Sequence, residues 1–95
     1  MNAQSPVENK QMKNILFVYQ TVLQKSTDAV INTLSDQGYS CFAKTASQLE
    51  NADYDQYDFL VGVDRADLRA MYRICGGDFA GKMFVLKDFI ERQET

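Results

Sequence analysis

Three apolar runs and one weaker, alternating segment along the chain have the length and composition of β-strands. The first contains Ile15-Leu16-Phe17-Val18, a continuous run that is typical of a strand covered on both faces inside a parallel sheet. A later run, Phe59-Leu60-Val61, has the same character. The pattern therefore predicts strands over residues 14–19, 39–44, 58–63 and 82–86.

Two segments between these strands have the spacing of amphipathic helices. The first helix is predicted over residues 26–37, where the hydroxyl of Ser26 or Thr27 can cap the first N–H groups. The second is predicted to begin after Asp64, a favourable N-cap, and to end near Cys75, ahead of two glycines. Its apolar residues recur at i, i+3, i+4 and i+7, so one face is predicted to pack against the sheet.

Strands that alternate with helices predict right-handed βαβ crossovers and a parallel sheet. We expect a small open α/β sheet of four strands in the order 2-1-3-4, with any ligand site beyond the carboxyl ends of strands 1 and 3. Residues 1–12 show no periodicity and are predicted to be a disordered lead-in. Residues 13–95 are predicted to form a single domain, in which residues 89–95 are too few for a full helix.

The composition excludes several classes of function. The 95 residues contain 10 Lys and Arg against 13 Asp and Glu, and the net charge of −3 argues against nucleic acid as the main partner. No apolar run approaches the ~20 residues of a membrane span. Histidine is absent, which removes the commonest general base and metal ligand. We therefore expect neither a metal site nor a cofactor.

The two cysteines, Cys41 and Cys75, indicate a reducing compartment, and a cytoplasmic protein is expected. Two thiols cannot form the disulfide framework of a small secreted domain. They also do not form a Cys-x-x-Cys pair, and each falls on the apolar side of its predicted element. Both are therefore predicted to be buried structural thiols rather than a redox site.

Three segments, in this order, resemble the low-molecular-weight protein tyrosine phosphatases. The first is the strand ending in Phe17-Val18, which leads through a short loop to Lys25-Ser26 and a helix. The second runs from Ala46-Ser47-Gln48-Leu49 through Tyr57-Asp58-Phe59-Leu60-Val61-Gly62-Val63-Asp64 to Asp67-Leu68, and the third from Gly81 to Phe89. Together they cover about three quarters of the chain. The resemblance implies a flavodoxin-like, phosphotyrosine-phosphatase-I-like fold.

The resemblance also implies a phosphate loop, which here has lost its reactive groups. The family uses a cysteine thiolate as the nucleophile, and Tyr19 stands at that position. The family's arginine, which holds phosphoryl oxygens as a planar fork, is replaced by Lys25. No glycine provides a turn whose N–H groups point at the phosphate. The degenerate loop positions are Tyr19, Gln20, Thr21, Val22, Leu23, Gln24, Lys25 and Ser26.

Two further features of the family are missing from this sequence. The family's general acid belongs to an Asp-Pro pair, and the only proline here, Pro6, follows a serine. The family's segment between the first helix and the third strand is also longer. A strand–helix pair is therefore predicted to be shortened to one strand and a connector over about residues 45–52. No catalytic residue is assigned.

These losses favour a non-catalytic phosphatase-like module that serves binding or regulation, with a protein or a small anion as its partner. Lys25 and Ser26 leave open a residual phosphate or sulfate site, against the simpler interpretation of a capped helix with a solvated lysine. One alternative is an enzyme with another constellation, such as Asp64 and a metal, although Asp64 is more simply a helix cap. Another is a structural domain of a larger assembly. The oligomeric state is left open.

Two groups of residues outside the loop also bear on function. Arg65, Arg69 and Arg73 recur at every fourth residue and predict a basic stripe on the exposed side of their helix. The simplest interpretation is a solvated face paired with Asp67 and other acids, and the alternative is a surface for an acidic partner. Tyr54 and Tyr57 flank Asp55 on a segment that is predicted to be exposed. Both tyrosines are interpreted as structural residues.

Overall fold

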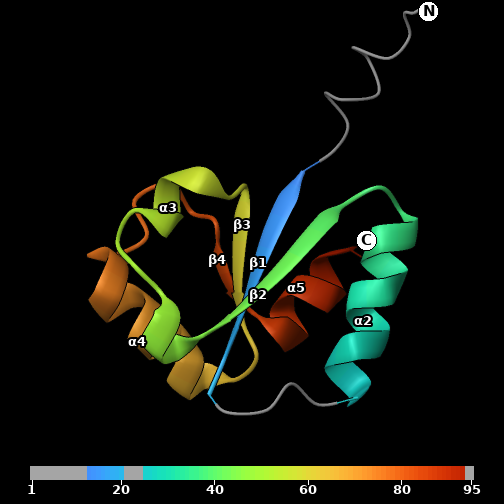
Figure 1. The fold of residues 1–95 in the computed structure, drawn as a ribbon, viewed down its shortest axis with the longest axis horizontal. Helices are drawn as coiled ribbons and strands as arrows, with labels where there is room; N and C mark the ends of the chain where they lie inside the picture. The colour runs from blue at the N-terminus through green and yellow to red at the C-terminus, as the bar shows by residue number, and fades with distance from the viewer. Residues whose placement is uncertain (1–12, 21–24, 94–95) are drawn as a thin grey trace, which may run out of the picture.

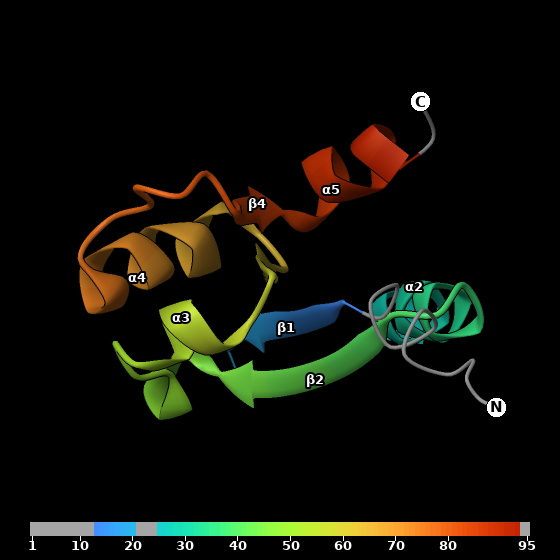
Figure 2. The ribbon, with the colours of Figure 1, turned by 90° about the horizontal axis from the view of Figure 1, so that it is seen from above.

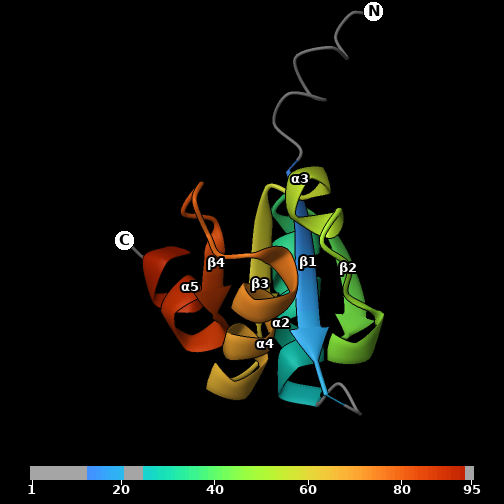
Figure 3. The ribbon, with the colours of Figure 1, turned by 90° about the vertical axis from the view of Figure 1, so that its left-hand side faces the viewer.

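The computed structural model describes residues 13–20 and 25–93, arranged as a sheet between two layers of helices (Figure 1). The lead-in predicted over residues 1–12 lies outside the described residues. Four parallel strands form the sheet in the order β2-β1-β3-β4, which confirms the predicted order (Figure 3). The strands are β1 (Asn14–Tyr19), β2 (Ser40–Thr45), β3 (Phe59–Gly62) and β4 (Met83–Val85).

Helices cover both faces of this sheet. Helices α2 and α5 lie on one face, and α4 with the short α3 lies on the other (Figures 1 and 2). The helical elements are α2 (Lys25–Asp36), the 3-10 turn η1 (Ala46–Gln48), α3 (Asp53–Gln56), α4 (Arg65–Cys75) and α5 (Leu86–Gln93). None of the helices in the described part of the chain is long and apolar enough to span a membrane.

Strand β1 is the centre of the hydrophobic core. Its four apolar side chains, from Ile15 to Val18, are all fully buried. Because successive side chains of a strand point to opposite faces, Leu16 and Val18 pack in the cluster beneath α4, whereas Ile15 and Phe17 pack in the cluster beneath α2 and α5. A single strand therefore belongs to both halves of the core.

The helix α5 is longer than the sequence pattern predicts. It begins at Leu86, directly after β4, whereas the pattern extends the strand to that residue and leaves no full helix after it. Phe89 is fully buried, and its ring centroid lies 5.4 Å from that of Phe59 and 5.6 Å from that of Phe84. The guanidinium carbon of Arg92 lies 5.0 Å from the Phe84 centroid. These tertiary contacts stabilise a helix that is too short to be stable alone.

Tyr54 is buried, although the sequence predicts an exposed segment around it. Its side chain is 3% exposed, and its hydroxyl donates a 2.6 Å hydrogen bond to Asp78 and accepts one from the N–H of Ala80. The Asp78 carboxylate also accepts the N–H groups of Lys82 and Met83. Burial raises the pKa of Asp78, but these hydrogen bonds outweigh it and lower the pKa. The loop between α4 and β4 is thereby tied to α3.

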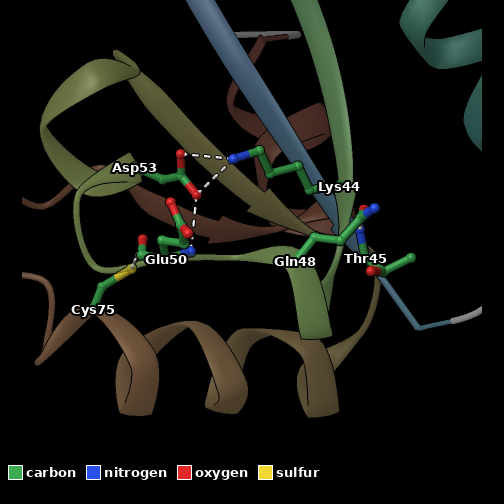
Figure 4. A network of polar contacts seen from close by, with 6 residues as sticks. All are labelled: Lys44, Thr45, Gln48, Glu50, Asp53 and Cys75. Atoms are coloured by element: carbon green, nitrogen blue, oxygen red, sulfur yellow. Dashed lines mark hydrogen bonds and ion pairs between the residues drawn. The ribbon is translucent and has the colours of Figure 1, made fainter.

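A network of polar contacts holds the short connector that follows β2 (Figure 4). The ammonium of Lys44 lies 2.9 and 3.0 Å from the two carboxylate oxygens of Asp53, which is 4% exposed. Asp53 also accepts the N–H of Glu50, and the Thr45 N–H donates to the side chain of Gln48. The hydrogen bond to Asp53 raises the pKa of Lys44, which favours the charged pair. The predicted connector thus contains the short helical turn η1, and α3, which follows it, is clamped to β2 by the Lys44–Asp53 pair.

Replacing Lys44 by Met should destabilise the fold by about 1–3 kcal/mol, because the buried Asp53 carboxylate loses its counter-charge. The free energy of unfolding, measured by urea denaturation at neutral pH, checks this. Lys87→Met removes an exposed lysine of α5 and should cost less than about 0.5 kcal/mol. The double variant Lys44→Met, Asp53→Asn should recover part of the loss. A cost for Lys44→Met no larger than that of the control would contradict the role of the pair.

Candidate functional site

The carboxyl edge of the sheet, at the bottom of Figure 1, brings together the ends of β1 and β3 and the starts of α2 and α4. Strand β1 pairs with both β2 and β3, so the strand order reverses beside it. Ligands bind at this switch point in open parallel sheets. Both described ends of the degenerate loop lie at this edge, namely Tyr19, Gln20, Lys25 and Ser26. The loop positions Thr21, Val22, Leu23 and Gln24 lie outside the described residues.

The first end of the loop is attached to α4 by a side chain. Tyr19 is the half-buried last residue of β1, opposite Thr45 of β2. The exposed Gln20 follows it, and its side-chain amide donates a 2.5 Å hydrogen bond to Oδ1 of Asp67. The chain therefore leaves the central strand in contact with the first turn of α4.

A reciprocal capping box holds that first turn. The Oδ1 atom of Asp64, the N-cap, accepts the N–H of Asp67 at 3.0 Å, and Oδ2 of Asp67 accepts the N–H of Asp64 at 3.2 Å. This confirms Asp64 as a helix cap. Gly62 ends β3 beneath this turn, where an added Cβ would lie 2.9 Å from the backbone nitrogen of Leu68. The missing side chain of Gly62 lets α4 begin close above the strand.

Asp67 is the buried carboxylate of the site. Its side chain is 1% exposed, and its two oxygens accept hydrogen bonds from the Gln20 amide and the Asp64 N–H. No lysine or arginine of the described residues forms an ion pair with it. Burial raises the pKa of Asp67, and the hydrogen bonds from Gln20 and Asp64 offset this only in part. The ionised form therefore places, beside Gln20, a negative charge that no lysine or arginine of the described residues neutralises.

The second end of the loop is the first turn of α2. The helix begins at Lys25, one residue earlier than predicted, so Ser26 and Thr27 lie inside its first turn. The residues just before Lys25, where the N-cap would stand, lie outside the described residues, so the capping role of Ser26 or Thr27 stays a prediction. Lys25 and Ser26 are exposed, whereas Thr27 is 1% exposed. An ammonium and a hydroxyl thus stand at the positive end of the helix dipole.

The cysteines lie away from this edge. Cys75 is buried in α4 and Cys41 is half-buried in β2, so the predicted burial is complete only for the first. Burial raises the pKa of both thiols, which disfavours the reactive thiolate. No group of three His, Cys, Asp or Glu within residues 13–20 and 25–93 is placed to hold a metal ion.

A comparison with protein families identifies the family of the chain. Residues 18–95 match the family described as low molecular weight phosphotyrosine protein phosphatase. The chain belongs to that family. The match starts at the end of β1 and includes the loop and every later element of this phosphatase-like domain. Comparisons with curated proteins and with solved structures found no match.

Sequence reasoning missed one residue of this candidate site. It assigned Asp67 to the solvated face of the helix, paired with the arginines, whereas the structure buries it beneath Gln20. The Asp-x-x-Asp spacing of Asp64 and Asp67 is that of a capping box, and this signal could have moved Asp67 into the first turn. The contact with Gln20 joins residues that are 47 positions apart, so no local sequence pattern predicts it.

Replacing Asp67 by Asn should change how stability depends on pH. The folded-state pKa is raised, so the unfavourable effect of ionising Asp67 disappears as the pH falls through that pKa. The natural protein should therefore gain stability relative to Asp67→Asn as the pH falls from 7 toward about 4, near the ordinary pKa of aspartate. Asn can keep both contacts, because the Gln20 amide can turn its oxygen toward the new NH₂ group.

Urea denaturation at several pH values measures this difference. Asp88→Asn, which changes an exposed carboxylate of α5, serves as the matched control. If the natural protein and Asp67→Asn show parallel stability profiles over this pH range, the desolvated carboxylate has no role in the pH dependence.

Proposed function

We propose that this chain is a non-catalytic member of the phosphatase family that serves binding or regulation. The observation that carries the proposal is the tyrosine at the end of β1, the position that the resemblance assigns to the nucleophile. A phenol is a poor nucleophile at neutral pH, and its phosphate ester is stable where a thiophosphate is labile. Without a thiol at Tyr19, the family's reaction has no first step.

The chemistry of the neighbouring groups supports the same proposal. Lys25 keeps the positive charge of the family's arginine but not its planar, bidentate geometry. The buried carboxylate of Asp67 contacts the loop at Gln20, and its negative charge opposes a phosphate dianion at that end. An enzyme of this family has to stabilise negative charge in its transition state. Both differences lower that stabilisation.

A residual anion site at Lys25 and Ser26 is the second part of the proposal. The first turn of a twelve-residue helix offers unpaired N–H groups and a partial positive charge, and Lys25 adds a full one. Asp67 acts against this site from the other end of the loop. We therefore expect weak binding of inorganic phosphate or sulfate, limited by the buried carboxylate.

Hydrolysis of para-nitrophenyl phosphate across acidic and neutral pH tests the absence of catalysis. The natural chain should give no turnover above buffer, because Tyr19 replaces the family's thiolate and residues 1–95 contain no Asp-Pro pair. Tyr19→Phe and Lys25→Ala are assayed beside it to separate the protein's own activity from a contaminant. Turnover that is lost in either variant would overturn the proposal, and turnover that needs Mg²⁺ and is lost in Asp64→Asn would establish a metal-dependent enzyme instead.

A titration with inorganic phosphate, followed by amide chemical shifts, tests the anion site. We expect shifts at Lys25 and Ser26, and affinity that is roughly threefold to tenfold higher in Asp67→Asn, since a repelling charge is removed. Lys25→Ala should weaken binding, whereas Lys87→Ala, its matched control on α5, should not. If phosphate moves neither amide, in the natural chain or in Asp67→Asn, the site does not exist.

A further inference from the structure

Three arginines line the outer side of α4, and no acidic residue in the described part of the chain pairs with them. Arg65, Arg69 and Arg73 are all exposed, and their helix lies in front of the sheet in Figure 3. Within residues 13–20 and 25–93, none of their side chains forms an ion pair or a hydrogen bond. The expected pairing with Asp67 is wrong, because that carboxylate is buried on the opposite side of the helix. The stripe is thus not neutralised by the described part of the chain.

The exposed side of α4 contains no acidic residue between Arg65 and Arg73. Its other exposed members are Ala66 and Tyr72, and the Tyr72 side chain is 41% exposed. The acidic residue within the helix, Asp67, lies on the buried side with Met71. Three guanidinium groups, a small residue and an aromatic ring therefore form one face, which we call the α4 arginine face. Arg and Tyr are enriched where binding energy concentrates at protein interfaces.

The distance between the arginines on this face determines which arrangement of carboxylates a partner must present. Successive arginines four residues apart are separated by about 6 Å along the helix axis, and the whole row is about 12 Å long. Carboxylates at every fourth residue of another helix have the same spacing. A guanidinium binds a carboxylate through two parallel hydrogen bonds, and Tyr72 can pack against an apolar residue between the acids.

We propose that the α4 arginine face docks an acidic helical segment of a partner protein, with glutamate or aspartate at every fourth position. The choice of an acidic partner rests on charge complementarity. The protein as a whole has a net charge of −3, but the charged residues of this face are all arginines, which attract carboxylates. A nucleic acid fits less well, because its closely spaced phosphates need a broader basic surface than one row of three. The face consists of α4 residues and includes none of the loop positions, so the proposal does not depend on phosphate binding or on the absence of catalysis.

A helical peptide of about 20 residues, with glutamate at every fourth position on an alanine background, is the probe. It is titrated into the full chain and followed by amide chemical shifts of α4 and by fluorescence anisotropy. The triple variant Arg65→Gln, Arg69→Gln, Arg73→Gln should weaken binding by roughly tenfold or more. The matched control, Lys10→Gln, Lys13→Gln, Lys87→Gln, removes the same charge elsewhere and should bind like the natural chain. Circular dichroism checks that both remain folded.

A second peptide of the same composition, with its glutamates gathered at one end, tests the spacing. It should bind more weakly than the first. If the arginine variant and the lysine control lose the same peptide affinity, the effect is one of net charge and the proposal is overturned. The absence of any binding to the natural chain would also overturn it. Tighter binding of a short DNA duplex to the same face would make nucleic acid the partner. Self-association lost in the arginine variant would make the partner a second copy, and either result would refute an acidic helix.

Discussion

The two-sided burial of β1 is the constraint on which the rest of the structure depends. Its four apolar side chains are divided between the two core clusters, so that α4 on one face and α2 with α5 on the other are positioned by the same strand. Its backbone also pairs with strands on both sides, which creates the reversal of strand order. The edge at which Tyr19, Gln20, Lys25 and Ser26 lie is therefore a direct result of this packing, whatever chemistry the loop retains.

Under the proposed function, this separation between scaffold and loop allows a phosphatase-family fold to persist without the family's reactive groups. The core residues and the capping box of α4 position the edge through packing and backbone hydrogen bonds, and none of these interactions requires a thiol or an arginine at the loop. The same edge contains Asp67, a carboxylate that is buried in the first turn of α4. Burial of Asp67 costs free energy, which the hydrogen bonds from Gln20 and Asp64 partly offset.

The sequence predicts the strands, their order and α4 well, because continuous apolar runs and helical spacing reflect burial directly. It fails where tertiary contacts override local preference. The helix α5 depends on the burial of Phe89 between aromatic rings. Tyr54 is buried because its hydroxyl donates a hydrogen bond to Asp78, which is 24 residues away. Tyr57 is likewise half-buried, with its ring 5.7 Å from that of Phe42. At the edge, the sequence identifies the loop ends and Asp64, but it cannot show that Asp67 lies beneath Gln20.

The position of β1 also has a consequence for biosynthesis. Proteins are made from the N-terminus, and the most apolar strand of this chain emerges before either of its neighbours. Its contact with the segment that begins β3 joins residues 44 positions apart, so one edge of the nascent strand stays open while the intervening residues are translated. An unpaired apolar strand is a template for pairing with other chains. Until β3 has been translated, β1 therefore keeps one unpaired edge, and a chaperone that binds extended apolar segments would shield it.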